Sequence, residues 1–496
     1  MIGTRIGKIF WLTLACLIVV DGLSLWGWHE PNLARIFVIV LAIVVFGLSY
    51  WRLDVGMWIV LAELIVGSKG YILSWAAPNF VVSIRLVLFA AIILAWLITR
   101  IRQKNFPFIH SSIFRSYVGL LICIFVGVIV SLLYHNKYID IFYDVNGYLY
   151  LGLLPVMYDA FSSRMAISKT LQVIWAALMA IFIKTAIMLF IFAGQFEFMV
   201  QAYRWIRDTR IDEVTLIAGN AYRIFSQSQI WSMFGFLIAL IVITLSGKAM
   251  ISRRWWWFFM VASGGVVIIS YSRSFWLALI ITLISWLWYL FRYGGRSKKA
   301  IVKYTAWLVL ILAGELLSII LIIRLPNLLK LNHNTASLSS LVEDRLANDQ
   351  QAGLQSRWNL IKPLTSKIIK QPIVGHGFGS TITYQSKDPR ITAGSGGGAY
   401  TTYSFEWGYL DILLKIGVVG LVVYAWFVGR ILKSGYRAIK DTGTEKPIML
   451  GLFFAMISLL ITHITTPYLN HPLGLGLIMF CAVVFEYATH DDGAPV

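Results

Sequence analysis

Long apolar runs recur along almost the whole chain and are separated mostly by short polar connections. The runs at 36–50 and 114–134, for example, are apolar enough to belong to helices that cross a hydrocarbon core about 30 Å thick, which takes roughly 20 residues. The pattern predicts about fourteen such helices, or about twelve if the third and the ninth, which are short or interrupted by glycine, are re-entrant. We therefore expect an all-α polytopic membrane protein of about 12–14 transmembrane helices. The predicted spans lie at 10–28, 34–51, 55–68, 80–99, 114–134, 138–158, 171–194, 229–246, 255–271, 274–291, 301–323, 408–429, 448–464 and 471–487.

Lysine and arginine collect in alternate connections between these predicted spans. If the N-terminus is cytoplasmic, basic clusters at 100–115, 248–254, 292–303 and 430–446 all face the cytoplasm, whereas the short connections on the other side carry only isolated basic residues. This distribution follows the positive-inside rule, and it predicts that both termini are cytoplasmic.

Two of the predicted outer connections are long, at 195–227 and 324–407. Long loops in a compact protein are uncommon unless they are functional or disordered. We expect the second to form a cap with helices at Leu338–Arg345 and Ser356–Lys370 and a flexible strap at Gly394–Gly398. The chain would then divide into an N-terminal transmembrane bundle (1–194), a bundle with the first outer loop and a short hairpin (195–323), the outer cap (324–407) and C-terminal transmembrane helices (408–496).

The composition excludes several classes of protein. Hydrophobic residues make up 59% of the chain and charged residues only 13%, whereas about a quarter of the residues in an ordinary soluble domain are charged. A secreted disulfide scaffold, a disordered chain and a nucleic-acid binder with its positive charge on one soluble face are therefore excluded. The formal net charge of +19 is large for a membrane protein and calls for a further explanation beyond topology.

Several ionisable residues fall inside predicted spans, where an unpaired charge is costly. Each of these residues is a candidate for function. For any one of them alone, however, a structural role is favoured, in which it pairs with another of these charges or extends to the membrane interface. Asp411 and Lys415 are four residues apart on one predicted helix, in the order that favours a local ion pair. The full set is Asp21, Glu63, Arg85, Lys184, Glu315, Asp411 and Lys415.

Two arginines lie at predicted outer ends of spans. Arg273, in Ser270-Tyr-Ser-Arg-Ser-Phe, is on a very short hairpin among hydroxyl groups, and Arg223 comes just before a span among serine and glutamine residues. An arginine binds phosphate oxygens in a bidentate manner and stays charged in a partly dry site. Both are therefore candidates for binding an anion, with contact to lipid headgroups as the alternative.

A third group of motifs follows in the cap and in the next span. It consists of Ser356-Arg-Trp358, Gln371-Pro-Ile-Val-Gly-His-Gly-Phe-Gly379, Tyr403-Ser-Phe-Glu-Trp-Gly-Tyr-Leu410 and Lys415-Ile-Gly-Val-Val-Gly420. In this order, and with Arg223 and the hairpin at Ser270–Arg273 before them, the motifs resemble those of the O-antigen ligase and polymerase superfamily of integral membrane proteins. The resemblance covers roughly residues 200–425.

The resemblance implies a membrane glycosyltransferase, similar in fold to those of the GT-C kind, in the inner (plasma) membrane of a bacterium with its large loop periplasmic or extracellular. Its donor would be an oligosaccharide on polyprenyl (undecaprenyl) pyrophosphate, used for O-antigen or exopolysaccharide. The acceptor is the lipid A core in the ligase branch, and the end sugar of another lipid-linked repeat unit in the polymerase branch. The expected partners also include membrane lipids and an associated flippase or chain-length regulator, and no cofactor is implied.

The arginines would supply electrostatic catalysis. Arg223, Arg273 and Arg357 would form a clamp for the pyrophosphate, on which negative charge develops as the anomeric bond breaks. The sequence has no outward Asp-x-Asp pair and no His, Asp or Glu cluster with the spacing of metal ligands. We therefore predict a reaction that needs no metal.

The last motif departs from the family pattern. Ligases of this family usually have a His-Asn pair where this chain has Glu406-Trp407. A carboxylate can replace imidazole as the base for an acceptor hydroxyl, so Glu406 is the leading candidate base and the polymerase branch is favoured over the ligase branch. An ion pair between Glu406 and an arginine of the loop is the alternative, and His376, Asp140 and Asp144 are the other candidate bases.

The remaining site residues are expected to contact the glycan. Tyr403 and Trp407 would stack on sugar rings, and His376, Asp140 and Asp144 would line the same site, although a membrane-interface belt also explains outer aromatic residues. A flippase for lipid-linked sugars is the competing class of function. It would need a cationic cavity open in turn to both sides, whereas the cationic motifs lie on one predicted side.

Overall fold

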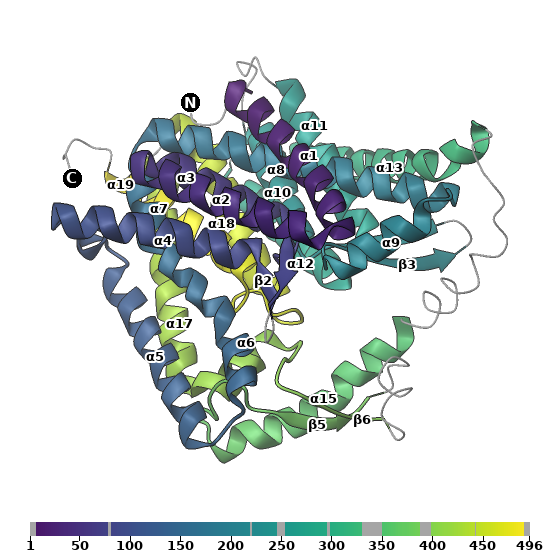
Figure 1. Ribbon diagram of the computed structural model, residues 1–496. Helices are drawn as coiled ribbons and strands as arrows, with labels where there is room; N and C mark the ends of the chain where they lie inside the picture. Colours follow the sequence, from purple (N-terminus) through teal and green to yellow (C-terminus); the bar gives the residue numbers. More distant parts are fainter. Residues whose placement is uncertain are drawn as a thin grey trace.

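The computed structural model describes residues 6–77, 81–218, 221–245, 253–294, 298–329, 350–386, 398–441 and 443–490. Helices dominate these segments (Figure 1). They are α1 Lys8–His29, α2 Pro31–Trp51, α3 Leu53–Val66, α4 Ile84–Gln103, α5 Phe114–Leu133, α6 Tyr138–Leu149, α7 Leu153–Ala160, α8 Arg164–Gly194, α9 Met199–Asp208, α10 Gln229–Leu245, α11 Arg253–Ile269, α12 Arg273–Arg292, α13 Lys298–Leu328, α15 Gln350–Lys370, α17 Gly408–Asp441, α18 Lys446–Thr462 and α19 Pro472–His490.

Within the described segments, 9 helices are long and apolar enough to cross a membrane, namely α1, α2, α4, α5, α8, α12, α13, α17 and α19. Three shorter apolar helices, α10, α11 and α18, match further predicted spans. The prediction of an all-α polytopic membrane protein is confirmed.

Two predicted spans are not long helices. The third is α3, which has only 14 residues. The sixth, at 138–158, is divided into α6, a 3-10 turn at Tyr150–Gly152 and α7. Hydropathy alone does not detect this interruption, because the residues on both sides of it are apolar.

The helical body is built around α10, whose residues from Gln229 to Ile243 are all buried. Because a helix that is apolar on every side must be covered on every side, α10 packs against α11 and α18. The long helix α8 contacts α1, α3, α11 and α13. These contacts form the scaffold from which the predicted outer connections extend.

Short antiparallel hairpins interrupt the helices. They pair β1 Ser74–Ala76 with β2 Val81–Ser83, β3 Glu213–Ala218 with β4 Ala221–Phe225, and β5 Ile382–Gln385 with β6 Ala399–Thr402. The first long connection contains α9 and the β3–β4 hairpin, and the second contains α15 and the β5–β6 hairpin.

Helix α15, β5 and β6 lie below the helical body in Figure 1, next to parts of α5, α6 and α17. A small core of their own is formed by Leu360, Leu364, Ile368, Ile382, Phe405 and Leu414. The predicted helix at Ser356–Lys370 is confirmed and begins earlier, at Gln350. The predicted helix at Leu338–Arg345 and the strap at Gly394–Gly398, apart from Gly398, lie outside the described residues.

Candidate functional site

Arg223 lies on β4 and reaches the short hairpin between α11 and α12. Its Nε donates a hydrogen bond to the backbone oxygen of Ser270 at 2.9 Å. Its guanidinium group lies 4.6 Å from the centroid of the Phe225 ring. The register places Arg223 opposite Thr215 of β3, so the β3–β4 hairpin fixes the direction from which this arginine approaches Ser270.

Arg273 is the first residue of α12, immediately after that hairpin. The chain turns sharply at Tyr271, which has a φ of 49°, and the N–H of Ser272 donates to Ser270 Oγ at 3.2 Å. Among the described residues, the exposed guanidinium group of Arg273 has no hydrogen-bond or ion-pair partner. The backbone of the hairpin therefore accepts a hydrogen bond from the partly buried Arg223, whereas Arg273, at the end of the hairpin, is exposed.

Arg357 belongs to a separate group of side chains on the cap. It forms an ion pair with Glu406, and its backbone oxygen accepts a hydrogen bond from Trp407 Nε1 at 3.0 Å. The Trp407 ring also contacts the Trp358 ring at a centroid distance of 5.6 Å. The alternative interpretation of Glu406, an ion pair with a loop arginine, is thus the arrangement observed.

The described geometry pairs Arg357 with Glu406 and links Arg223 to the Ser270 hairpin. In Figure 1, β3 and the N-terminal end of α15 extend toward the same side of the view. The assignment of all three arginines to one clamp stays a prediction.

Asp140 and Asp144 both lie on α6. The Asp144 side chain is only 5% exposed, accepts a hydrogen bond from the N–H of Gly379 at 2.8 Å and forms an ion pair with Lys415. Burial raises the pKa of the Tyr403 phenol, and the negative charges of Asp140 and Asp144 raise it further. Both carboxylates therefore act electrostatically on Tyr403, and the assignment of the three residues to one glycan site stays a prediction.

The glycine-rich turn at 371–379 packs into a break in α17. At Gly417 the backbone leaves the helical conformation, with φ 66° and ψ −173°, and a helix break buried in a membrane protein needs other partners for its freed backbone groups. The turn supplies these partners. The hydrogen bonds across the break are His376 N to Leu414 O (2.6 Å), Gly377 N to Lys415 O (3.1 Å), Val418 N to Pro372 O (2.8 Å) and Val419 N to Ile373 O (3.2 Å).

The glycine spacing of this turn follows from the same contact. Gly375, Gly377 and Gly379 all have positive φ angles between 69° and 77°, a region that glycine adopts without strain. A Cβ atom at Gly375 would lie only 2.7 Å from the backbone of Gly417. The two glycine motifs, far apart in sequence, are therefore two halves of one close backbone contact.

His376 lies in this turn with its ring directed toward α15. Its Nε2 donates to the backbone oxygen of Lys367 at 2.7 Å. Burial lowers the pKa of the imidazole below its ordinary value, although the hydrogen bond to Lys367 opposes this effect. The ring thus anchors the turn to the end of α15, and its proposed contact with glycan stays a prediction.

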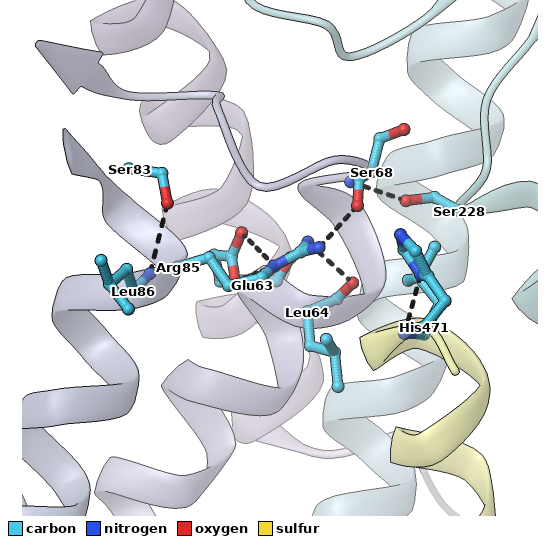
Figure 2. A network of polar contacts seen from close by, with 9 residues as sticks. Glu63, Leu64, Ser68, Ser83, Arg85, Leu86, Ser228 and His471 are labelled. Atoms are coloured by element: carbon cyan, nitrogen blue, oxygen red, sulfur yellow. Dashed lines mark hydrogen bonds and ion pairs between the residues drawn. The ribbon is translucent and has the colours of Figure 1, made fainter. Parts of the chain in front are cut away.

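Most ionisable residues inside the predicted spans are paired, as expected. Asp21 pairs with Lys184 at 2.6 Å, and Asp411 pairs with Lys415 at 2.6 Å. Figure 2 shows Arg85 between the Glu63 carboxylate, at 3.1 Å, and the backbone oxygen of Ser68, at 2.6 Å.

The Arg85 contacts also connect distant parts of the body. The Ser68 N–H donates to Ser228 Oγ at 2.9 Å (Figure 2). Ser228 lies just before α10, in the segment that follows β4. The Arg85–Glu63 pair is therefore linked, through Ser68, to the segment between β4 and α10. Glu315 differs from the paired residues, because both of its carboxylate oxygens are buried without a hydrogen-bond partner among the described residues.

In the part of the chain that the structure describes, no group of three or more His, Cys, Asp or Glu side chains is arranged to hold a metal ion. Metal independence stays a prediction that needs an assay.

Sequence reasoning did not detect the ion pair between Asp144 and Lys415. Both residues had been singled out, one as a candidate base and the other as a charge inside a span, but 271 positions separate them. It also did not detect the contact between Ser274 and Thr466, whose hydroxyl oxygens lie 2.8 Å apart. Neither pairing has a signal in a single sequence, because it depends on how α12, α17 and the last connection pack.

Comparison with known proteins identifies part of the chain. Residues 258–425 match the family described as O-antigen ligase, and no curated protein matches the chain. The match includes Arg273, Arg357, Glu406 and the glycine motifs on both sides of the helix break. Residues 258–425, about a third of the chain, therefore match an O-antigen ligase domain, and this match supports the resemblance of the chain to the O-antigen ligase and polymerase superfamily.

Proposed function

We propose that the protein polymerises oligosaccharide repeat units carried on polyprenyl (undecaprenyl) pyrophosphate, at the outer face of a bacterial inner membrane. A ligase or polymerase type of function in surface polysaccharide biosynthesis follows from the family domain. The choice of the polymerase branch, the lipid pyrophosphate donor and the orientation are our proposal. Both termini would be cytoplasmic, and segments 195–227 and 324–407 would face the periplasm.

The hydrogen bond from Arg223 Nε to the backbone oxygen of Ser270 is the observation that carries this proposal. It brings a strand of the first long connection onto the hairpin that ends in Arg273. A diphosphate bound at this hairpin would meet one arginine already held in place and a second that is exposed. Guanidinium groups bind phosphate oxygens in a bidentate manner, so this corner of the molecule suits a pyrophosphate leaving group.

The chemistry requires charge stabilisation and removal of one proton. The oxygen of an acceptor hydroxyl attacks the anomeric carbon of the donor sugar, and the bond from that carbon to the pyrophosphate oxygen breaks. The pyrophosphate leaves with the electron pair, and its developing charge is stabilised by the arginines. The hydroxyl proton passes to a base, for which Glu406 is the candidate.

The ion pair between Arg357 and Glu406 is compatible with these roles. Its side chains are 37% and 49% exposed, and a pair with this exposure contributes roughly 0–1 kcal/mol. Substrate can therefore open the pair at little cost, which frees Glu406 for an acceptor hydroxyl and Arg357 for a phosphate. The hydrogen bond from Trp407 to the Arg357 backbone keeps the two residues adjacent while this happens.

The residue at position 406 is the reason for favouring a polymerase. Ligases of the family usually carry histidine at this place, and a carboxylate there weakens the ligase assignment while keeping a base available. Transfer onto the lipid A core by a ligase is the alternative.

Conservative replacement of the arginines tests the clamp. Arg273→Lys and Arg223→Lys each keep the positive charge but lose the guanidinium geometry, so each should reduce long-chain glycan by more than about tenfold with the protein still in the membrane. Arg35→Lys is the matched control, because Arg35 is an exposed arginine near the predicted outer end of another helix, α2. Normal chain length in both clamp variants would refute the assignment.

A further inference from the structure

Lys415 lies between two aspartates in the interior of the protein. Its Nζ pairs with Asp411 at 2.6 Å, one helical turn earlier on α17, and with Asp144 of α6. The side chains of Lys415, Asp411 and Asp144 are only 2%, 1% and 5% exposed. Water therefore does not compete for these groups, and the three charges are confined to one another and to their hydrogen-bond donors.

The network extends from Lys415 to the glycine-rich turn along two routes. Through its side chain, Lys415 holds Asp144, which accepts a hydrogen bond from the N–H of Gly379. Through its backbone, the oxygen of Lys415 accepts a hydrogen bond from the N–H of Gly377 at 3.1 Å. One residue thus binds both ends of the three-residue segment that follows His376.

The network also reaches the start of α17 and the last connection. Asn470 Nδ2 donates to Asp411 Oδ2 at 2.6 Å, and the N–H of Asp411 donates to the backbone oxygen of Trp407 at 2.8 Å. The Lys415 ammonium lies 5.8 Å from the centroid of the Phe405 ring. The first turns of α17, which follow Glu406 directly, are therefore tied to α6, to the turn and to the loop before α19.

We propose that Lys415 is a positioning residue for the transferase site. This inference rests on the proposed function, because it assigns to Lys415 the task of holding the start of α17, and with it Glu406, against the glycine-rich turn. Lys415 itself does not touch substrate. At Gly417 the backbone of α17 leaves the helical conformation. Helical hydrogen bonds therefore do not fix the segment before Gly417 relative to the segment after it, and other contacts, such as those of Lys415, have to hold the first segment in place.

The charges in the network predict which substitutions the fold tolerates. Lys415→Met alone leaves two carboxylates buried without a counter-charge, and removing one partner of a buried ion pair is strongly destabilising. The triple variant Asp144→Asn, Asp411→Asn, Lys415→Met removes all three charges together. Because this variant leaves no uncompensated charge in the interior and each new side chain is similar in volume to the one it replaces, the triple variant should fold.

The test compares these variants by two independent measurements in the full-length protein. Hydrogen–deuterium exchange reports on the peptides that contain 375–379 and 415–420. Steady-state kinetics with a polyprenyl pyrophosphate oligosaccharide give kcat and KM. The matched control is Asp159→Asn with Arg100→Gln, which removes a partly buried ion pair of 2.6 Å between α4 and α7.

We expect Lys415→Met to be recovered in much lower amounts as folded protein. The triple variant should fold, exchange faster by more than about tenfold in the two peptides, and show a kcat lower by about tenfold or more with donor KM changed less than about twofold. The control should match wild type in both measurements.

Several results would overturn the inference. Folded and fully active Lys415→Met would show that the ion pairs do not matter. Faster exchange with unchanged kcat in the triple variant would mean that the network is structural only, and a lower kcat with unchanged exchange would mean that Lys415 does not act by holding the turn. If wild type forms no glycan product, the proposed function fails by itself, and the exchange measurement still decides whether Lys415 holds the turn.

Discussion

Gly417→Ala should destabilise the protein by about 3 kcal/mol, because residue 417 adopts a backbone conformation that is nearly restricted to glycine. Its φ of 66° and ψ of −173° fall in a region where a residue with a Cβ costs about 1–3 kcal/mol. A Cβ at this position would also lie 2.7 Å from the backbone nitrogen of Gly375. The glycine-rich turn would therefore have to move away from the helix break, which adds the loss of hydrogen bonds across it.

Gly429→Ala is the matched control, since Gly429 lies on the same helix and a Cβ there meets no atom within 4 Å. Alanine should be neutral at 429, or stabilising by up to about 1 kcal/mol. Unfolding of the purified variants by titration with a denaturing detergent measures the difference, and glycan chain length measures its effect on activity. If Gly417→Ala and Gly429→Ala unfold at the same midpoint, the turn does not depend on the break, and the account of the two glycine motifs is wrong.

Three further predictions concern the site and its support. Glu406→Gln should lower kcat by about 10²–10⁴-fold, the usual contribution of a general base, with donor binding retained; full activity would mean that another residue is the base. Activity of the purified protein should survive EDTA, and sensitivity to the chelator would overturn metal independence. Burial raises the pKa of Asp212 to about 6 from 3.8, against the opposing effects of Lys184 and Ser226. Because the folded state then holds this proton more tightly than the unfolded state, stability should fall by up to about 3 kcal/mol as the pH rises from about 4 to above 6. Asp212→Asn should remove this dependence, and a melting profile with the same pH dependence in the variant would contradict it.

The transmembrane helices were predictable because lipid offers no hydrogen bonds to backbone or polar groups. Each helix that crosses a membrane therefore needs its own continuous run of apolar residues, which the sequence shows directly. The sixth predicted span shows the limit of that signal. A Cβ at Gly147 would meet the backbone of Asn470, so α6 ends near a contact with the last connection. Hydropathy contains no information about such a contact between distant segments.

The candidate site was predictable as a set of motifs and much less as a set of partners. The sequence singled out Arg223 and the Ser270–Arg273 hairpin, and the structure joins them through the Ser270 backbone. It offered two interpretations of Glu406, and the choice of Arg357 as its partner depends on how α15 lies against the start of α17. Tertiary packing sets the positions of these side chains relative to one another, and the pattern of residues in a single sequence does not predict that packing.

Under the proposed function, the positive charge of the predicted outer connections attracts the donor. Basic residues of the predicted outer connections run against the positive-inside bias, and they include both arginines of the Ser270 hairpin contact. A polyanionic donor would be attracted to that side of the membrane and held at the Ser270 hairpin, which Arg223 contacts and Arg273 follows.

The most direct test of the central claim is incubation of the purified protein with a polyprenyl pyrophosphate oligosaccharide as the only substrate, followed by separation of the glycan by size. The account predicts a ladder of products that differ by one repeat unit, formed without any added acceptor. Transfer that occurs only after addition of a lipid A core would contradict the polymerase assignment in favour of a ligase, and absence of transfer to either acceptor would contradict the transferase function itself.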